Sequence, residues 1–214
     1  MLNSVRNCNI LLTEVDMQRL TEQIMSETKS LPEGMPLSAK SLLHLGSRAA
    51  VDQTLSRLVH RGQLLRAGRG LYVTPVVSRF GKRAPAVEAV IENLADVRGE
   101  TIVPSEASSA NALGLTTQVP TKAVYLTSGR PRTLALGKQT VQLRHVRPWK
   151  LTLAHEPAGQ IVRALSWAGP AHVESAANTI RTKVPNEEFR KVVRHAAKLP
   201  SWMAKAVGRI ANNG

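Results

Sequence analysis

The chain has 214 residues, 43% of them hydrophobic, which is ordinary for a soluble globular protein and allows one or two domains with their own cores. Its formal net charge of +14 at pH 7 indicates a polyanionic or acidic partner, through long-range attraction and counterion release. The single cysteine, Cys8, excludes an intramolecular disulfide and a zinc site with several cysteine ligands.

Two features of the sequence argue against a membrane or an export route. No apolar run approaches the roughly 20 residues that are needed to span a bilayer. The first residues contain Arg6 and then the apolar run 10–12, which is too short for a secretory signal. We therefore expect a cytoplasmic protein with no membrane partner.

Two helices are expected in the first 45 residues. Residues 13–26 predict an amphipathic helix that Thr13 can cap. Its apolar stripe comprises Met17, Leu20 and Ile24. After a Pro-Gly loop, a short helix is expected over residues 39–45, with Leu42 and Leu43 facing the core.

A longer amphipathic helix is expected between Ser47, a good N-cap, and Gly62, a good stop. One apolar stripe at helical spacing comprises Val51, Leu55, Leu58 and Val59. The opposite face comprises Ala49, Ala50, Gln53, Ser56, Arg57 and His60. These side chains are small or polar, as in a helix that enters a DNA major groove.

A basic hairpin follows, with strands at Leu64–Ala67 and Leu71–Val73 around the tip Gly68-Arg69-Gly70. A short helix, a glycine turn, a longer helix and such a hairpin in series predict a winged helix-turn-helix. Residues 36–83 carry nine basic side chains and one acid, Asp52. With a basic linker at its end, this DNA-binding domain is expected to span residues 1–83.

A second domain is expected over residues 84–214. Its predicted helices cover residues 85–96, 104–113, 155–167, 170–182, 186–198 and 201–210. Its predicted strands are Ala123–Thr127, Arg132–Leu136 and Thr140–Val146. Trp167 and Trp202 are interpreted as core anchors. The predicted fold class is therefore α+β, with an N-terminal winged helix-turn-helix, then a mixed domain with a small antiparallel sheet and C-terminal helices.

The DNA-binding prediction assigns each basic or polar side chain a role. Gln53 and Arg57 are the candidates for base edges, because glutamine pairs with adenine and arginine with guanine in the major groove. Ser47 and Arg48, at the helix start, are candidates for phosphate contacts. Further phosphate candidates are Lys40, Arg61, Arg66 and Arg69, the last of which could instead enter the minor groove. Two alternatives remain open: a solvated structural helix and a winged helix that binds protein.

A second basic segment lies at residues 122–150, which hold seven cations and no acid. These are Lys122, Arg130, Arg132, Lys138, Arg144, Arg147 and Lys150. If they share one sheet face or its turns, they could meet an acidic protein or DNA. Simple solvation of an exposed sheet is the third possibility.

Catalytic patterns are weak, so we expect no enzyme, no catalytic residues, no metal, no cofactor and no small-molecule substrate. Gly46-Ser47 resembles the start of a nucleotidyltransferase motif, but no Asp-x-Asp pair follows it. The Glu-x-Lys at residues 27–29 resembles a nuclease motif, but it ends a helix where that motif needs a strand. The six histidines show no metal-ligand spacing.

Two parts of the chain resemble AbiEi-type antitoxins of type IV toxin–antitoxin systems. The N-terminal likeness is carried by the run GSRAAVDQTLSRLV at 46–59, Gly62, Leu64 and residues 69–72. The C-terminal likeness, to one branch of that family, is carried by residues 125–129, 136–137 and 143–145. Together they cover most of the chain, and the helices after Pro185 are the least matched.

The resemblance implies two roles. The N-terminal domain would bind inverted repeats in its own promoter, as double-stranded DNA, and repress it. The C-terminal domain would neutralise a cognate toxin that resembles a nucleotidyltransferase. The alternative is a stand-alone winged-helix transcriptional regulator without a toxin partner.

Overall fold

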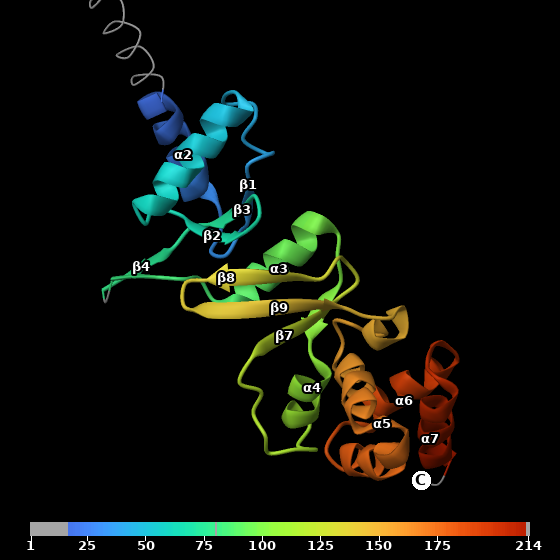
Figure 1. Ribbon diagram of the computed structural model, residues 1–214. Helices are drawn as coiled ribbons and strands as arrows, with labels where there is room; N and C mark the ends of the chain where they lie inside the picture. The colour runs from blue at the N-terminus through green and yellow to red at the C-terminus, as the bar shows by residue number, and fades with distance from the viewer. Residues whose placement is uncertain (1–16, 80, 213–214) are drawn as a thin grey trace, which may run out of the picture. The chain divides into compact units, whose positions relative to one another are not determined.

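The computed structural model describes residues 17–79 and 81–212, which divide into two compact units (Figure 1). Unit 1 contains the described residues up to Arg98 together with Leu134–Thr140. Unit 2 contains Gly99–Thr133 and the described residues from Val141 onward. Helices and small sheets alternate in the chain, which confirms the predicted α+β class. The expected cap at Thr13 lies outside the described residues.

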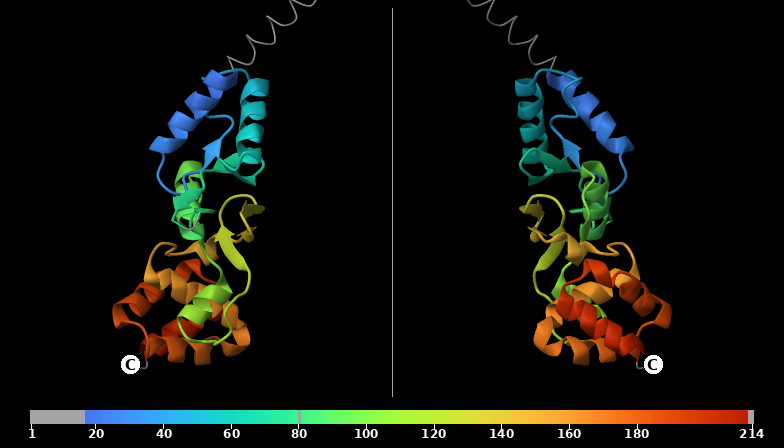
Figure 2. Two further views of the ribbon diagram at one scale, coloured as in Figure 1. Left: turned by 90° about the vertical axis from the view of Figure 1, so that its left-hand side faces the viewer. Right: turned by 90° about the vertical axis from the view of Figure 1, so that its right-hand side faces the viewer.

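Unit 1 begins with a helix at residues 17–30 and continues through a small sheet and a second helix. These elements are β1 (Leu37–Ser38), α2 (Arg48–His60), β2 (Leu65–Gly68) and β3 (Leu71–Val73). The sheet has the order β1–β3–β2, and both pairs are antiparallel. The two helices flank β1 in both views of Figure 2. This arrangement is compatible with the predicted winged helix-turn-helix.

The hydrophobic core of unit 1 confirms the two helical stripes except at Met17, which is partly exposed and is not part of the core. Ile24, Leu55 and Leu58 are fully buried, and Leu20 is nearly so. The hydroxyl of Ser47 accepts a hydrogen bond from the backbone N–H of Ala50, as an N-cap does. The helix ends just before Gly62, which has a φ of +62°. The apolar period and the caps therefore placed this helix correctly.

The prediction of a short helix over residues 39–45 is wrong. This segment is a series of turns closed by bonds between residues three apart, such as Ser41 N to Ser38 O at 3.1 Å. The physical reason is that Ser38 already belongs to β1, where it pairs with Leu71, so the chain leaves an extended strand. Leu42 is fully buried, but Leu43 is 41% exposed and does not face the core.

The predicted basic linker contains a two-stranded antiparallel ribbon. Its strands are β4 (Val76–Ser78) and β5 (Gly81–Arg83), which form a two-stranded sheet with each other. Gly81 has a φ of +104°, a conformation that glycine adopts without steric cost. Figure 1 shows β4 running outward from the three-stranded sheet of unit 1.

The predicted domain boundary at residues 83/84 differs from the division in the structure, because helix α3 (Val87–Arg98) belongs to unit 1. Glu33 accepts a hydrogen bond from the backbone N–H of Ala86, and its own carbonyl accepts one from Asn93. At Gly34, which has a φ of +78°, a Cβ would lie only 2.9 Å from the backbone of Ala89. The loop and the helix are therefore packed too closely to separate into different units.

Unit 2 opens with a strand that the sequence did not predict. Its early elements are β6 (Ile102–Pro104), α4 (Glu106–Ala112), β7 (Ala123–Thr127), β8 (Arg132–Leu136) and β9 (Gln139–His145). Strands β8 and β9 belong only in part to unit 2, because Leu134–Thr140 is assigned to unit 1. The strand order is β6–β7–β9–β8, with β6 and β7 antiparallel but β7 and β9 parallel. The sheet is mixed because β9 turns back from β8 and inserts beside β7. Pro104, expected to open a helix, ends β6, and Ser105 caps α4 instead.

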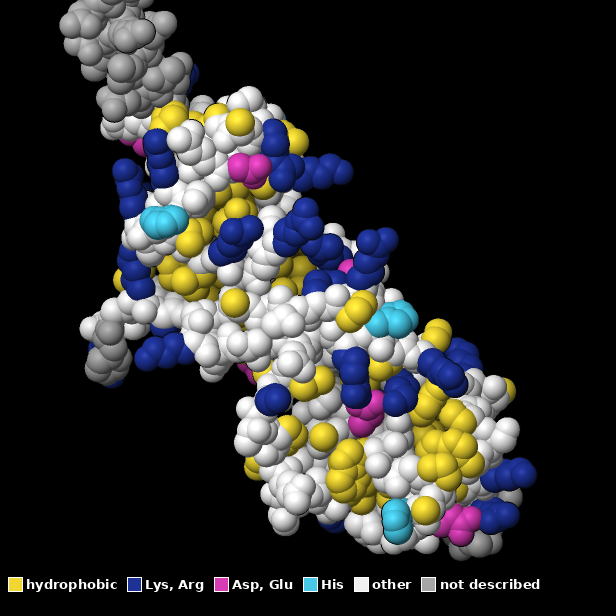
Figure 3. All heavy atoms as spheres, in the orientation of Figure 1, with side chains coloured by type: hydrophobic (Ala, Val, Ile, Leu, Met, Phe, Trp, Pro, Cys, Tyr) yellow, Lys and Arg dark blue, Asp and Glu magenta, His cyan; other side chains and the backbone are white. Residues whose placement is uncertain are grey.

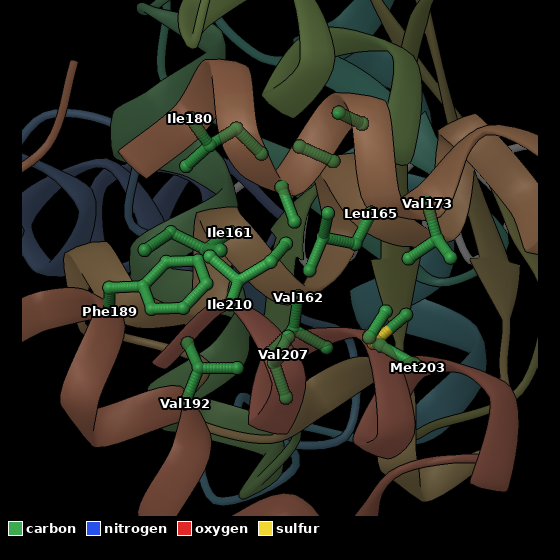
Figure 4. Packing of buried hydrophobic residues seen from close by; sticks show 14 of the residues in the cluster. Ile161, Val162, Leu165, Val173, Ile180, Phe189, Val192, Met203, Val207 and Ile210 are labelled. Atoms are coloured by element: carbon green, nitrogen blue, oxygen red, sulfur yellow. The ribbon is translucent and has the colours of Figure 1, made fainter. Parts of the chain in front are cut away.

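The C-terminal helices build the largest core. After a 3-10 helix at Pro148–Leu151, these are α5 (Pro157–Arg181), α6 (Asn186–Arg194) and α7 (Ser201–Asn212). Helix α5 is kinked at Gly169 and Pro170, so it corresponds to the two helices predicted there. Figure 4 shows Ile161, Phe189 and Val207 from the three helices in one cluster. This confirms the predicted C-terminal helical region.

Candidate nucleic-acid interface

Helix α2 presents its polar face to solvent. Gln53, Ser56, Arg57 and His60 are exposed, whereas Val51 on the opposite side is fully buried. All eight side chains predicted to contact DNA are exposed: Lys40, Ser47, Arg48, Gln53, Arg57, Arg61, Arg66 and Arg69. Such a face can approach a duplex without repacking of the core.

Two contacts restrain the arginines of this face. Arg48 Nε donates to the Asp52 carboxylate at 2.7 Å, one helical turn away, and both side chains are largely exposed. Arg57 Nη1 lies 3.6 Å from the sulfur of Met17. Contacts between exposed groups contribute little to stability, so both guanidinium groups can turn toward a phosphate or a base at small cost.

Further cations surround α2 on other elements of unit 1. Lys40 lies in the turns after β1, and Arg66 and Arg69 lie in the β2–β3 hairpin. A hollow of about 930 Å³ beside them is lined in part by Lys40, Arg48 and Arg98. Figure 3 shows Lys and Arg side chains spread over the visible face of this unit. The arrangement is suited to a polyanion.

The second basic segment is not an uncompensated surface. Arg132 forms two hydrogen bonds to the Glu100 carboxylate, and Arg144 and Lys150 both donate to Glu106. Both acids precede residue 122, so the composition of the segment alone could not show that three of its cations are paired. Lys138 belongs to unit 1 and the other six cations to unit 2. Lys122, Arg130 and Arg147 are exposed.

Comparison with known proteins places the chain in a family. A family described as being of unknown function, DUF6088, matches residues 23–192, which include every residue predicted to contact DNA. The chain belongs to DUF6088. No curated protein and no solved structure matches it.

In this DUF6088 chain, the buried Glu106 is the centre of a charge cluster in unit 2 that contains the buried Arg163, the partly buried Lys150 and the exposed Arg144. Burial raises the pKa of Glu106, but the hydrogen bond from Lys150, a backbone hydrogen bond and the charges of Lys150 and Arg144 outweigh it, so the pKa lies below its ordinary value. Burial lowers the pKa of Arg163 to about 10, against the opposing charge of Glu106. Arg163 donates to the hydroxyl of Ser109 at 3.3 Å.

The stability of the protein should therefore depend on Glu106 at acidic pH. Because the folded-state pKa of Glu106 is depressed, its contribution is complete above the unfolded pKa of about 4.5 and is lost as pH falls through the lower folded value. Between pH 6 and pH 3, we expect the melting temperature of the wild type to fall more than that of Glu106→Gln. Only the wild type loses the ion pairs of Glu106 when the carboxylate is protonated. Equal falls in the two proteins would contradict this, as measured by circular dichroism.

Trp167 is not the core anchor that its sequence context suggested. Its side chain is 44% exposed on α5, just before the kink, whereas Trp202 is partly buried against the core. A pocket of about 500 Å³ beside Trp167 is also lined by Lys122 and Arg144. An exposed tryptophan between polar and cationic side chains is typical of a protein-interaction surface.

Metal and membrane features are absent from the part of the chain that the structure describes. Within residues 17–79 and 81–212 no group of three or more His, Cys, Asp or Glu side chains is placed to hold a metal ion. No helix in those ranges has the length and apolar character required to cross a bilayer.

Proposed function

We propose that this chain is a double-stranded DNA-binding repressor that acts on its own promoter and is also an antitoxin. One observation carries the first part: Gln53 and Arg57 are exposed on the polar face of α2 while the opposite face is buried. A helix buried on one side and open on the other, with a basic hairpin after it, has what major-groove insertion requires. The cations around it would hold the phosphates.

Binding to the DNA upstream of the gene tests the repressor role. A fluorescently labelled duplex of that DNA and a random duplex of equal length are titrated at about 150 mM salt. We expect the upstream duplex to bind at least about 10³-fold more tightly, as specific binders do. Equal affinity for the two duplexes would remove the repressor role.

The antitoxin role is supported by the resemblance of the C-terminal half to AbiEi-type antitoxins. The partner would be a toxin that resembles a nucleotidyltransferase. Growth of cells that express the product of the neighbouring downstream gene, with and without this chain, tests it. If that product is toxic and the chain does not restore growth, the stand-alone regulator is the better description.

Trp167→Ala should weaken neutralisation of the toxin and leave DNA binding unchanged. Truncating an exposed aromatic at the centre of an interface commonly costs about 2 kcal/mol or more, a loss of about thirtyfold in affinity. Growth rescue and the Kd for the toxin measure the effect. Val97→Ala, at another exposed apolar side chain but in unit 1, is the control. Full rescue by Trp167→Ala would show that the toxin binds elsewhere.

A further inference from the structure

The ribbon formed by β4 and β5 is an exposed, cationic element, and within residues 17–79 and 81–212 neither strand pairs with a third one. Val77 is 73% exposed, and Gly81, Lys82 and Arg83 are all exposed. An isolated two-stranded hairpin is marginally stable in water, so such an element needs anchors or a partner. None of the described residues of the ribbon belongs to the hydrophobic core of unit 1.

Two side-chain contacts join the ribbon to the rest of unit 1. Lys82 Nζ donates to the carbonyl of Gly62 at 3.1 Å, directly after the end of that helix. Arg83 Nη2 lies 3.6 Å from the carboxylate of Glu33 in the loop before β1. The two strands stay paired along their length, from Val76 with Arg83 to Ser78 with Gly81, and Arg79 follows directly after this last pair. The bond of Lys82 therefore places the ribbon next to the C-terminal end of α2, the helix that carries Gln53 and Arg57.

The chemistry of the ribbon matches a nucleic-acid backbone. Residues 74–83 contain Arg79, Lys82 and Arg83 and no acid. Val77 pairs with Lys82 across the ribbon, so an apolar and a cationic side chain share one face. The ammonium of Lys82 has three donors, and the bond to Gly62 uses one of them. Arms that combine cations with an apolar residue are suited to phosphates and the minor groove.

We infer that the β4–β5 ribbon is a second DNA-contacting element, which lies along the phosphate backbone and minor groove next to the site of α2. The inference rests on the proposed DNA binding and adds a contact site to it. The contact carries no base specificity, because backbone phosphates are the same at every step. It lengthens the DNA segment covered by one protein molecule.

The test compares a ribbon double variant, Arg79→Ala with Lys82→Ala, with a control double variant, Arg19→Ala with Lys29→Ala. Both remove two positive charges from exposed positions of unit 1, but the control positions lie on the helix at residues 17–30. The ribbon variant should lose about tenfold in affinity for upstream and random duplexes alike. The slope of log K against log salt should fall by about 2, since each lost phosphate contact removes about 0.9.

Hydroxyl-radical footprinting locates the contact. The ribbon variant should lose protection over one backbone segment that flanks the bases read by α2, and the control should lose none. Arg79→Glu leaves the hydrogen bond from Lys82 to Gly62 intact and should remove the same protection. This single variant replaces the double variant in the experiment if the double variant is unstable.

Three outcomes would overturn the inference. Equal losses in the ribbon and control variants would mean that net charge alone acts. An unchanged footprint would mean that the ribbon does not touch DNA. A changed oligomeric state with unchanged DNA binding would make the ribbon a protein contact. If the wild type does not prefer upstream DNA, the repressor proposal fails, but the comparison on random duplex still decides the ribbon.

Discussion

Arg57→Ala should relax discrimination at one base pair of the operator while leaving affinity for random DNA nearly unchanged. Arg57 lies on the exposed face of α2, and a bidentate arginine–guanine pair contributes about 1–3 kcal/mol of discrimination against other bases. We therefore expect roughly 5- to 150-fold weaker binding to the operator. Titration against a set of operators with single base changes measures the effect and identifies the base pair, because only that change should become neutral in the variant.

Lys40→Ala and Arg69→Ala are the matched controls for Arg57→Ala. Both side chains are exposed and predicted to hold phosphates, so each should weaken all sequences alike and reduce the salt slope by about one. Arg57 also contacts the sulfur of Met17, so the melting temperature of the variant is measured first. If Arg57→Ala weakens operator and random DNA equally, Arg57 does not take part in base readout.

Glu106→Gln should reduce the free energy of unfolding by about 3 kcal/mol. The carboxylate of Glu106 is 9% exposed and pairs with Arg144 and Lys150, and its charge opposes the desolvation of the buried Arg163. The amide keeps the shape of the side chain but removes the charge, so the buried Arg163 and the partly buried Lys150 are left without an opposing charge. Chemical denaturation followed by circular dichroism at neutral pH measures the loss.

Glu174→Gln is the matched control for this prediction. Glu174 pairs with Arg209, but both side chains are more than half exposed, where ion pairs contribute about 0–1 kcal/mol. Its unfolding curve should lie close to that of the wild type. Similar curves for Glu106→Gln and the wild type would mean that the cluster around Glu106 is not a significant source of stability.

The elements that sequence analysis placed well are those with local signals. Helix α2 has both an apolar period and a cap at Ser47, and the strands β7 and β8 were predicted with the bounds that the structure has. Periodicity and capping depend on residues within about one turn or one strand of each other, so they can be read from a sequence alone. The exposure of the eight DNA-binding candidates could be predicted in the same way, because most of them lie on or beside elements with such local signals.

The elements that were missed or misread depend on partners far along the chain. Strand β6 has three residues, and the β-branched run before Pro104 is a strand only because it pairs with β7. The short apolar run at residues 39–45 resembled a helix, but Ser38 is held in a strand by Leu71. The ribbon β4–β5 resembled a linker because its two strands have three residues each. Short segments carry too few residues for a period to be distinguished.

By itself, the sequence determined the net charge of +14, the polar face of α2 and the mixed class of the fold, because composition and local periodicity do not depend on contacts. Only the tertiary structure decided which charges remain free and which aromatics are exposed. Glu106 pairs with cations 38 and 44 residues later, and Trp167 is exposed by the way α5 packs. Burial and ion pairing are properties of three-dimensional neighbours, and the chain brings those neighbours together only when it folds.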